Sequence, residues 1–152
     1  MSVDILGELK SNHAIWASIG SWAMAQFIKI MIELKKTKKI NTALIVSSGG
    51  MPSSHSSFVT AMTTSIGFKE GFNSSLFALS AVFSMVVMYD AAGVRRAAGH
   101  QAAAINMLFK RFEDQGIKLD KNLKELLGHT PFEVAAGAFL GIFVAIAFVY
   151  II

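Results

Sequence analysis

The sequence predicts an all-α membrane protein, a single domain over residues 1–152 built as a polytopic bundle of about four transmembrane helices with one further cytoplasmic or interfacial helix. Two observations predict this class. Hydrophobic residues make up 53% of the chain and charged residues only 16%, whereas a soluble domain usually carries about a quarter charged residues. In addition, apolar runs alternate with basic connections. The chain has no cysteine, which excludes disulfides, zinc–thiolate sites and cysteine nucleophiles.

The first and last apolar runs are the clearest predicted spans. The run from Ala14 to Leu34 is long enough to cross a hydrocarbon layer of about 30 Å at about 1.5 Å per residue. The run from Pro131 to Ile152 is apolar apart from Glu133. Within it, Gly137 and Gly141 have the four-residue spacing that lets two membrane helices approach closely.

Three intermediate segments are less clear. Residues 75–89 read SLFALSAVFSMVVMY and reach spanning length if the helix continues to Val94. Residues 55–68 are fewer and rich in Ser and Thr, whose hydroxyls normally face other helices at membrane depth, and we predict a fourth span there. Residues 103–112, AAINMLFKRF, have apolar residues at helical spacing beside basic ones and are suited to lie on the membrane surface.

The basic residues predict the orientation. Of the 14 lysines and arginines, 11 lie in two alternate connections, at residues 35–39 and 95–124. Four spans place both connections on one side, which the positive-inside rule makes cytoplasmic, so both termini are expected outside. The net charge of +4 is therefore attributed to membrane orientation, and no nucleic-acid partner is expected. Because Asp4 and Glu8 precede a run too long for a signal peptide, we expect the first span to be retained in the plasma (inner) membrane.

The first candidate motif is SSGGMPSSHSS, residues 47–57. Gly50 lets backbone approach a ligand, and Ser53 and Ser54 place hydroxyls and amides at the start of a helix, where anions bind. His55 then follows in the first helical turn, where it can exchange a proton with a phosphate ester. A capped helix start with an incidental histidine explains the same residues.

The second motif is YDAAGVRRAAGHQ, residues 89–101. Arg95 and Arg96 are surrounded by small residues, which leaves room for guanidinium groups to bind phosphate oxygens. Both are also ordinary topology anchors at a cytoplasmic helix end. Asp90 is expected to pair with an arginine or to cap the next helix, and His100 is expected to be structural.

The third motif is LGHTPFEV, residues 127–134. His129 precedes a helix start, and Glu133 stands four residues later, so the carboxylate can fix one ring nitrogen and leave the other as a nucleophile or base. Alternatively, Thr130 and Glu133 form a capping box.

A weaker point lies in the first span, where Gln26 and Lys29 share one helical face. Lys29 is placed either to extend toward the cytoplasmic surface or to lend positive charge to the same site.

Together, GGMPSSHS, YDAAGVRRAAG and LGHTPFEV resemble the small divergent membrane branch of the type 2 phosphatidic acid phosphatase superfamily, which includes the vanadium haloperoxidases. The resemblance extends from about Gln26 to the C-terminus. The superfamily motif Pro-Ser-Gly-His matches residues 52–55, with serine in place of glycine at position 54, and the resemblance implies that His55 is the general acid. It also implies that His129 is the nucleophile that forms a phosphohistidine and that Glu133 orients it.

The chain departs from the superfamily at two phosphate-binding arginines. At the two positions where the superfamily has these arginines, this chain has Lys36 and Leu123. We therefore expect Arg95 and Arg96 to supply the positive charge, with Lys29 as the lysine.

The function expected from these residues is metal-independent and cofactor-independent hydrolysis of a lipid-linked phosphate or diphosphate, of phosphatidate or polyprenyl type, at the cytoplasmic membrane face. The alternative is a non-catalytic protein that binds or transports lipid phosphates and keeps the oxyanion pocket. Because the chain is shorter than a six-helix superfamily core, a homo-oligomer that buries polar faces is a further expectation. The expected site residues are, as catalytic groups, His129, His55 and Glu133 and, as substrate-binding groups, Arg95, Arg96, Ser53, Ser54, Gly50 and Lys29.

Overall fold

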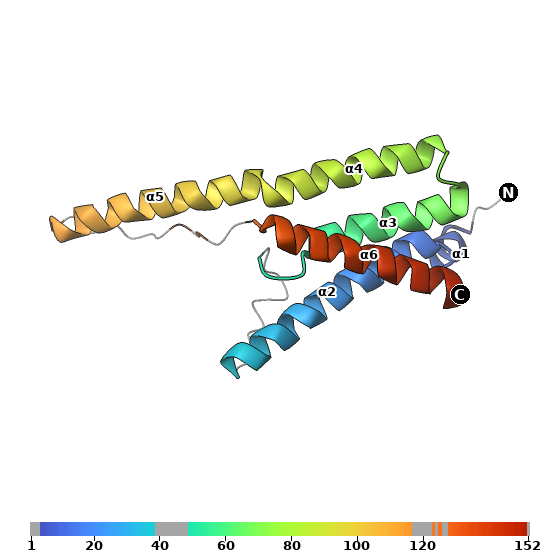
Figure 1. Ribbon diagram of the computed structural model, residues 1–152, viewed down its shortest axis with the longest axis horizontal. Helices are drawn as coiled ribbons and strands as arrows, with labels where there is room; N and C mark the ends of the chain where they lie inside the picture. Colours follow the sequence, from blue (N-terminus) through green and yellow to red (C-terminus); the bar gives the residue numbers. More distant parts are fainter. Residues whose placement is uncertain (1–3, 39–48, 117–122, 124, 126–127, 152) are drawn as a thin grey trace.

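The computed structural model describes residues 4–38, 49–116, 123, 125 and 128–151, and within them it contains helices and no strand, as predicted. The helices are α1 (Ile5–Lys10), α2 (His13–Thr37), α3 (Ser54–Glu70), α4 (Ser75–Ala92), α5 (Val94–Asp114) and α6 (Pro131–Ile151) (Figure 1). Some residues of the motifs and connections given above lie outside the described part of the chain: Lys39, Ser47, Ser48, Lys118, Lys121, Lys124, Leu127 and Ile152.

Short polar side chains define where the long helices begin. The side chain of Asn12 accepts a hydrogen bond from the Ile15 amide at 3.3 Å, and Ser74 accepts one from the Phe77 amide at 3.2 Å. Ser53 caps α3 in the same way. These caps satisfy amides that have no partner within their own helix, so local sequence sets the helix starts.

Helix α3 is the centre of the bundle and packs against α2, α4 and α6. The contact with α6 depends on the two glycines predicted to allow close approach. A Cβ atom at Gly137 would lie 3.0 Å from the carbonyl carbon of Ser53, and one at Gly141 would lie 2.9 Å from the amide nitrogen of Ala61. The small-residue spacing in α6 therefore brings the two backbones together, as the sequence predicts.

Hydroxyl groups connect α3 to its three neighbours. Ser57 donates to the Ser21 carbonyl of α2 at 3.0 Å, Thr60 donates to the Ala138 carbonyl of α6 at 3.1 Å, and Ser84 of α4 donates to the Val59 carbonyl at 3.0 Å. The prediction that the polar residues of this segment face other helices is confirmed.

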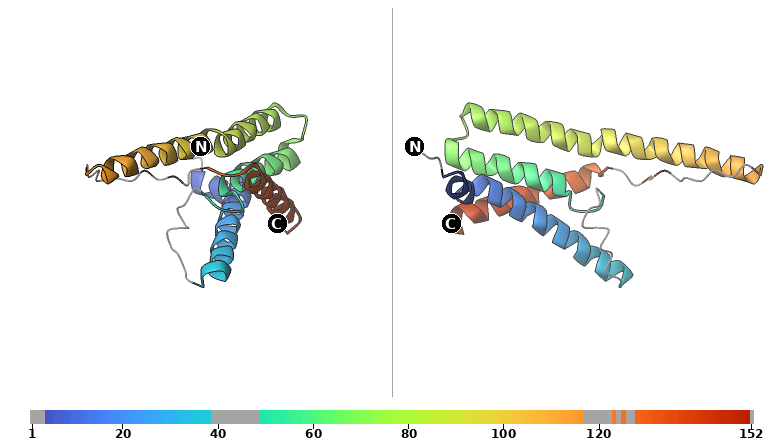
Figure 2. Two further views of the ribbon diagram at one scale, coloured as in Figure 1. Left: turned by 60° about the vertical axis from the view of Figure 1, so that its left-hand side comes forward. Right: turned by 180° about the vertical axis from the view of Figure 1, so that it is seen from behind.

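Three stretches of the described chain are long and apolar enough to cross a membrane: α2, the combined stretch of α4 and α5, and α6. Helix α3 has 17 residues and does not meet this criterion, so the predicted count of four spans is not established. The helix is too short, and its Ser and Thr content also lowers its hydropathy although neighbouring helices satisfy these groups. Helix α3 nevertheless lies alongside α6 and α4 in every view (Figure 2).

Helices α2, α3, α4 and α6 place four of their ends on one side of the bundle, with the end of α2 splayed away from the others (Figure 1). These are the C-terminal ends of α2 and α4 and the N-terminal ends of α3 and α6, while both chain termini lie at the opposite end (Figure 1). Helix α5 extends beyond the side of the bundle where α3 and α6 begin (Figure 1). It begins at Val94 rather than near residue 103, so the arginine pair belongs to this helix.

Candidate functional site

Two histidines from distant parts of the chain face each other at the end of the bundle where α3 and α6 begin. The ring centroids of His55 and His129 are 6.1 Å apart, with an edge-on angle of 65°. Backbone hydrogen bonds fix this arrangement. The Ser53 amide donates to the Glu133 carbonyl at 2.9 Å, and the His129 amide donates to the Ala91 carbonyl at 2.9 Å. The three motifs therefore meet in one place.

The His129 side chain is 1% exposed and is held by a carboxylate. Its Nδ1 atom lies 3.2 Å from Oε2 of Glu133. Its Nε2 atom is buried and has no hydrogen-bond partner among the described residues, and the same is true of Nδ1 of His55. Each ring thus keeps one unpaired nitrogen, which is the state a nucleophile or a proton carrier requires before substrate binds.

The pKa of His129 lies below the ordinary 6.5, mainly because burial disfavours the charged ring. The hydrogen bond from Glu133 opposes this shift, while the positive charges of Lys29 and Arg95 add to it. His129 is therefore neutral at physiological pH.

Glu133 also closes a capping box at the start of α6. Its Oε2 atom accepts from the Thr130 amide at 3.0 Å, and the Thr130 hydroxyl accepts from the Glu133 amide at 3.3 Å. The structural and the functional interpretations of this carboxylate therefore hold together, because one oxygen contacts both the helix start and the imidazole.

Lys29 points into the site and not toward the membrane surface. It is 4% exposed, and its Nζ atom donates to Oγ of Ser54 at 3.3 Å. Gly50, at φ 86°, brings its backbone against the lysine stem, since a Cβ atom there would lie 4.0 Å from Cδ of Lys29. Of the two predicted placements of Lys29, the one facing the histidine motifs is observed.

The start of α3 contributes buried hydroxyls and a helix N-terminus. Ser53 is 0% exposed, and its Oγ atom accepts from the amide of Ser56 at 3.4 Å and from its hydroxyl at 3.0 Å. Ser54 is likewise buried. The partial positive charge of the helix end is therefore directed toward the same region as the Lys29 ammonium group.

The two arginines lie differently with respect to this site. Nε of Arg95 forms an ion pair with Oδ2 of Asp90 at 2.7 Å, and both side chains are partly exposed. Its charge acts on His129, as described above. The Arg96 side chain is exposed, and so is that of His100. The structure thus brings Arg95 toward the histidines but gives Arg96 no contact with them among the described residues.

The chain is similar to known proteins over nearly its whole length. A model of the Divergent PAP2 family matches residues 10–144. The chain belongs to the Divergent PAP2 family. It is also 42% identical over 154 residues to the uncharacterized membrane protein YuiD of Bacillus subtilis (strain 168), covering 94% of this chain and 98% of that protein. Together with the apolar helices, this relative identifies the chain as an integral membrane protein. No solved structure matches.

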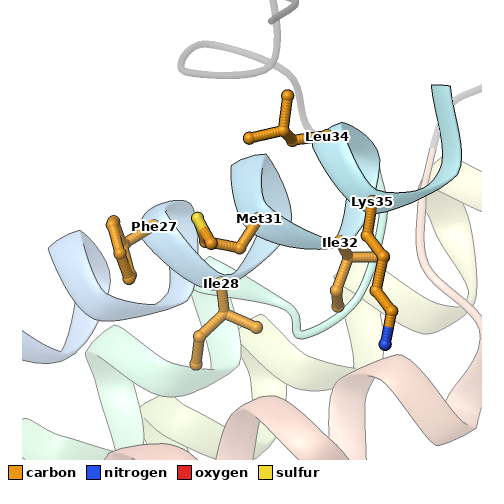
Figure 3. Close-up of a pocket in the computed structure, with 6 residues that line it drawn as sticks. All are labelled: Phe27, Ile28, Met31, Ile32, Leu34 and Lys35. Atoms are coloured by element: carbon orange, nitrogen blue, oxygen red, sulfur yellow. The ribbon is translucent and has the colours of Figure 1, made fainter. Parts of the chain in front are cut away.

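An apolar surface pocket lies on α2 of this Divergent PAP2 chain. It has a volume of about 530 Å³ and is lined by the C-terminal half of that helix, at Phe27, Ile28, Met31, Ile32, Leu34 and Lys35. Figure 3 shows Ile28, Ile32 and Lys35 on the side of α2 that faces the other helices. Lys29, which contacts Ser54, belongs to the same helix but is not among the residues that line this pocket.

Within the described part of this family member, no three His, Asp or Glu side chains gather closely enough to hold a metal ion. Lys29 and Arg95 are the cationic groups whose charges act on His129.

Two positioning features were not anticipated from the sequence. Gly128 adopts φ 87°, and a Cβ atom there would lie 2.5 Å from the amide nitrogen of Arg96, so only glycine lets this segment pack on the start of α5. The Ala91 carbonyl that holds the His129 amide belongs to α4. The glycine directly before His129 was a usable signal for the first feature, whereas a backbone carbonyl carries no sequence signature.

Proposed function

We propose that this protein hydrolyses a phosphate or diphosphate ester of a lipid or isoprenoid alcohol through a phosphohistidine, at the cytoplasmic face of the plasma membrane. The observation that carries the proposal is the pairing of two partly unsatisfied imidazoles at 6.1 Å, one of them bound to a carboxylate. Membership of the Divergent PAP2 family supports a phosphatase-related role.

In the first step, Nε2 of His129 attacks phosphorus in line with the ester oxygen. This requires the tautomer with the proton on Nδ1, which Glu133 favours by accepting it. The N–P bond forms, the P–O bond breaks, and His55 gives its proton to the departing oxygen, which belongs to the alcohol of a monophosphate or to the lipid phosphate of a diphosphate. Lys29, Arg95 and the N-terminus of α3 stabilise the charge on the other phosphoryl oxygens.

In the second step, water attacks the phosphohistidine. His55, now neutral, takes a proton from the water as the O–P bond forms. The N–P bond breaks, which returns the electron pair to Nε2 of His129 and releases inorganic phosphate. Each imidazole reverses its own role between the steps: His129 is first the nucleophile and then the leaving group, and His55 is first the acid and then the base.

The surroundings of the site favour an amphiphilic substrate. Helix α2 carries both Lys29 and an apolar pocket that includes Ile28 and Ile32, and we propose that the hydrocarbon chain of a phosphate held at the lysine follows this helix (Figure 3). Burial of such a chain contributes about 25 cal/mol per Å² of apolar surface.

Replacement of the proposed nucleophile tests the mechanism. We expect His129→Ala to lose phosphate release from a panel of lipid phosphates, including phosphatidate and a polyprenyl diphosphate, by about a thousandfold or more. The control is His100→Ala, which removes an exposed imidazole and is expected to keep wild-type release. Gel filtration and helicity measured in detergent show that each variant is folded. Full release by folded His129→Ala would overturn the proposal.

A second candidate is a protein that binds lipid phosphates without hydrolysing them. It is favoured by the pairing of Arg95 with Asp90, which leaves this guanidinium already engaged. The same panel distinguishes the two functions. The binder is supported if the wild-type protein binds a lipid phosphate saturably but releases no phosphate from it, so that there is no turnover for orthovanadate to inhibit.

A further inference from the structure

Helix α5 leaves the bundle with an apolar stripe uncovered. The stripe consists of Val94, Ala98, Ile105, Leu108 and Phe112, whose spacing places them on one helical face. Val94, Leu108 and Phe112 are 58%, 51% and 44% exposed. Figures 1 and 2 show α5 extending past the ends of α2, α3 and α6. Such a stripe is costly in water and requires an occupant.

The start of the stripe is fixed at the membrane boundary. Helix α4 has 18 residues, which span about 27 Å. Val94 follows directly, after a break in the helix at Gly93, where φ is −103° and ψ is −77° and no side chain caps α5. Figures 1 and 2 show α5 continuing nearly in line with α4, and a glycine at this junction lets α5 bend toward the plane of the membrane. The stripe therefore begins where the headgroup layer begins.

The polar side of α5 is predominantly basic. Arg95, Arg96, Lys110 and Arg111 lie away from the stripe, and all four are exposed. The acidic residues Glu113 and Asp114 stand together at the far end. Long basic side chains beside an apolar stripe that carries phenylalanine are suited to an acidic lipid surface, since the stems reach over the apolar face while the charges contact headgroups.

The composition of α5 argues against a second copy of the chain as the occupant. Ala97, Ala102 and Phe109 widen the apolar arc beyond the narrow seam of a two-helix coiled coil. The positions flanking the stripe also lack the alternating acidic and basic residues that pair such helices.

We propose that α5 bends at Gly93 and binds the surface of an acidic bilayer, with the stripe inserted among the headgroups at the end of the bundle that holds His55 and His129. The first turn of α5 stays with the site, because Gly128 packs against the Arg96 backbone. Binding of α5 to the surface then holds Arg95 at headgroup level. The proposal does not depend on the hydrolytic activity.

The chain has no cysteine, so single labels report on α5 in the full-length protein. Ile105→Cys and Leu108→Cys place an environment-sensitive fluorophore on the stripe, and Met107→Cys and Lys110→Cys are matched controls on the other side. Each is reconstituted in vesicles of phosphatidylcholine alone or of phosphatidylcholine with phosphatidylglycerol. In the acidic vesicles, we expect nitroxide lipids to quench the stripe labels about twofold or more beyond the controls.

A charge variant tests recognition of the acidic surface. Leu108→Cys combined with Lys110→Gln and Arg111→Gln is expected to lose much of the quenching in acidic vesicles. Equal quenching of stripe and control labels would overturn the proposal. Stripe labels shielded from both nitroxide lipids and an aqueous quencher would do so too, because that result indicates a protein partner. Equal stripe quenching in neutral and acidic vesicles would overturn recognition of acidic lipid.

Discussion

His129 is held between one carboxylate and two cationic groups, and this environment decides its protonation. Burial lowers the pKa of the ring below 6.5, and the nearby Lys29 and Arg95 charges lower it further. The unfolded chain therefore binds more protons than the folded one just below pH 6.5. The contribution of neutral His129 to stability is present above this pH and is lost as the pH falls through the lowered pKa.

Glu133→Gln tests how the carboxylate acts on His129. Because the carboxylate raises the pKa of the ring, we expect the amide to move the acidic limb of the kcat profile to lower pH and to reduce kcat by about tenfold or more. The measurement compares the pH profile of phosphate release for the wild type with that for the variant. Glu8→Gln, which changes an exposed residue of α1, is the control. A limb that moves to higher pH would contradict the assigned electrostatics.

At the scale of helices, the contact of α3 with α6 depends on the absence of side chains at two positions. Gly141→Ala would bring its Cβ atom against the Thr60 hydroxyl and the Ser57 carbonyl, so the helices must separate. We expect a loss of about 1–3 kcal/mol in the free energy of unfolding in detergent. Gly20→Ala is the control, since its Cβ atom would lie 3.4 Å from the Phe148 ring, an ordinary contact. Equal stability of the two variants would contradict this packing.

Helix α3 also shows how a helix packed between others can have a low hydropathy. Its Ser57 and Thr60 hydroxyls donate to carbonyls of α2 and α6, so they reduce hydropathy without meeting lipid. From the Ser and Thr content of this segment, the sequence predicts that its hydroxyls face other helices. The rotation that directs each hydroxyl to a particular neighbour depends on the packed bundle.

At the scale of the whole molecule, the orientation in the membrane is open to a direct test. If α3 crosses, Ser11 and Glu113 lie on opposite sides; if it does not, the chain crosses three times and Glu113 lies on the side of Ser11. We expect a membrane-impermeant maleimide to label Ser11→Cys in intact cells and Glu113→Cys only in inside-out vesicles. Labelling of both from outside would contradict four crossings.

The sequence by itself determined that the protein lies in a membrane and is helical, and it singled out the three motifs that meet in the structure. These properties follow from composition and from spacing within single helices, as at the Ser53 cap and the glycine pair of α6. It also left correct alternatives for Lys29 and Asp90 without choosing between them. The tertiary structure alone decided that Lys29 contacts Ser54, that Arg95 pairs with Asp90 while Arg96 is exposed, and that the His55 and His129 rings lie 6.1 Å apart. Distances between separate helices depend on their rotation and crossing, which arise from packing of the whole bundle, and no local pattern encodes them.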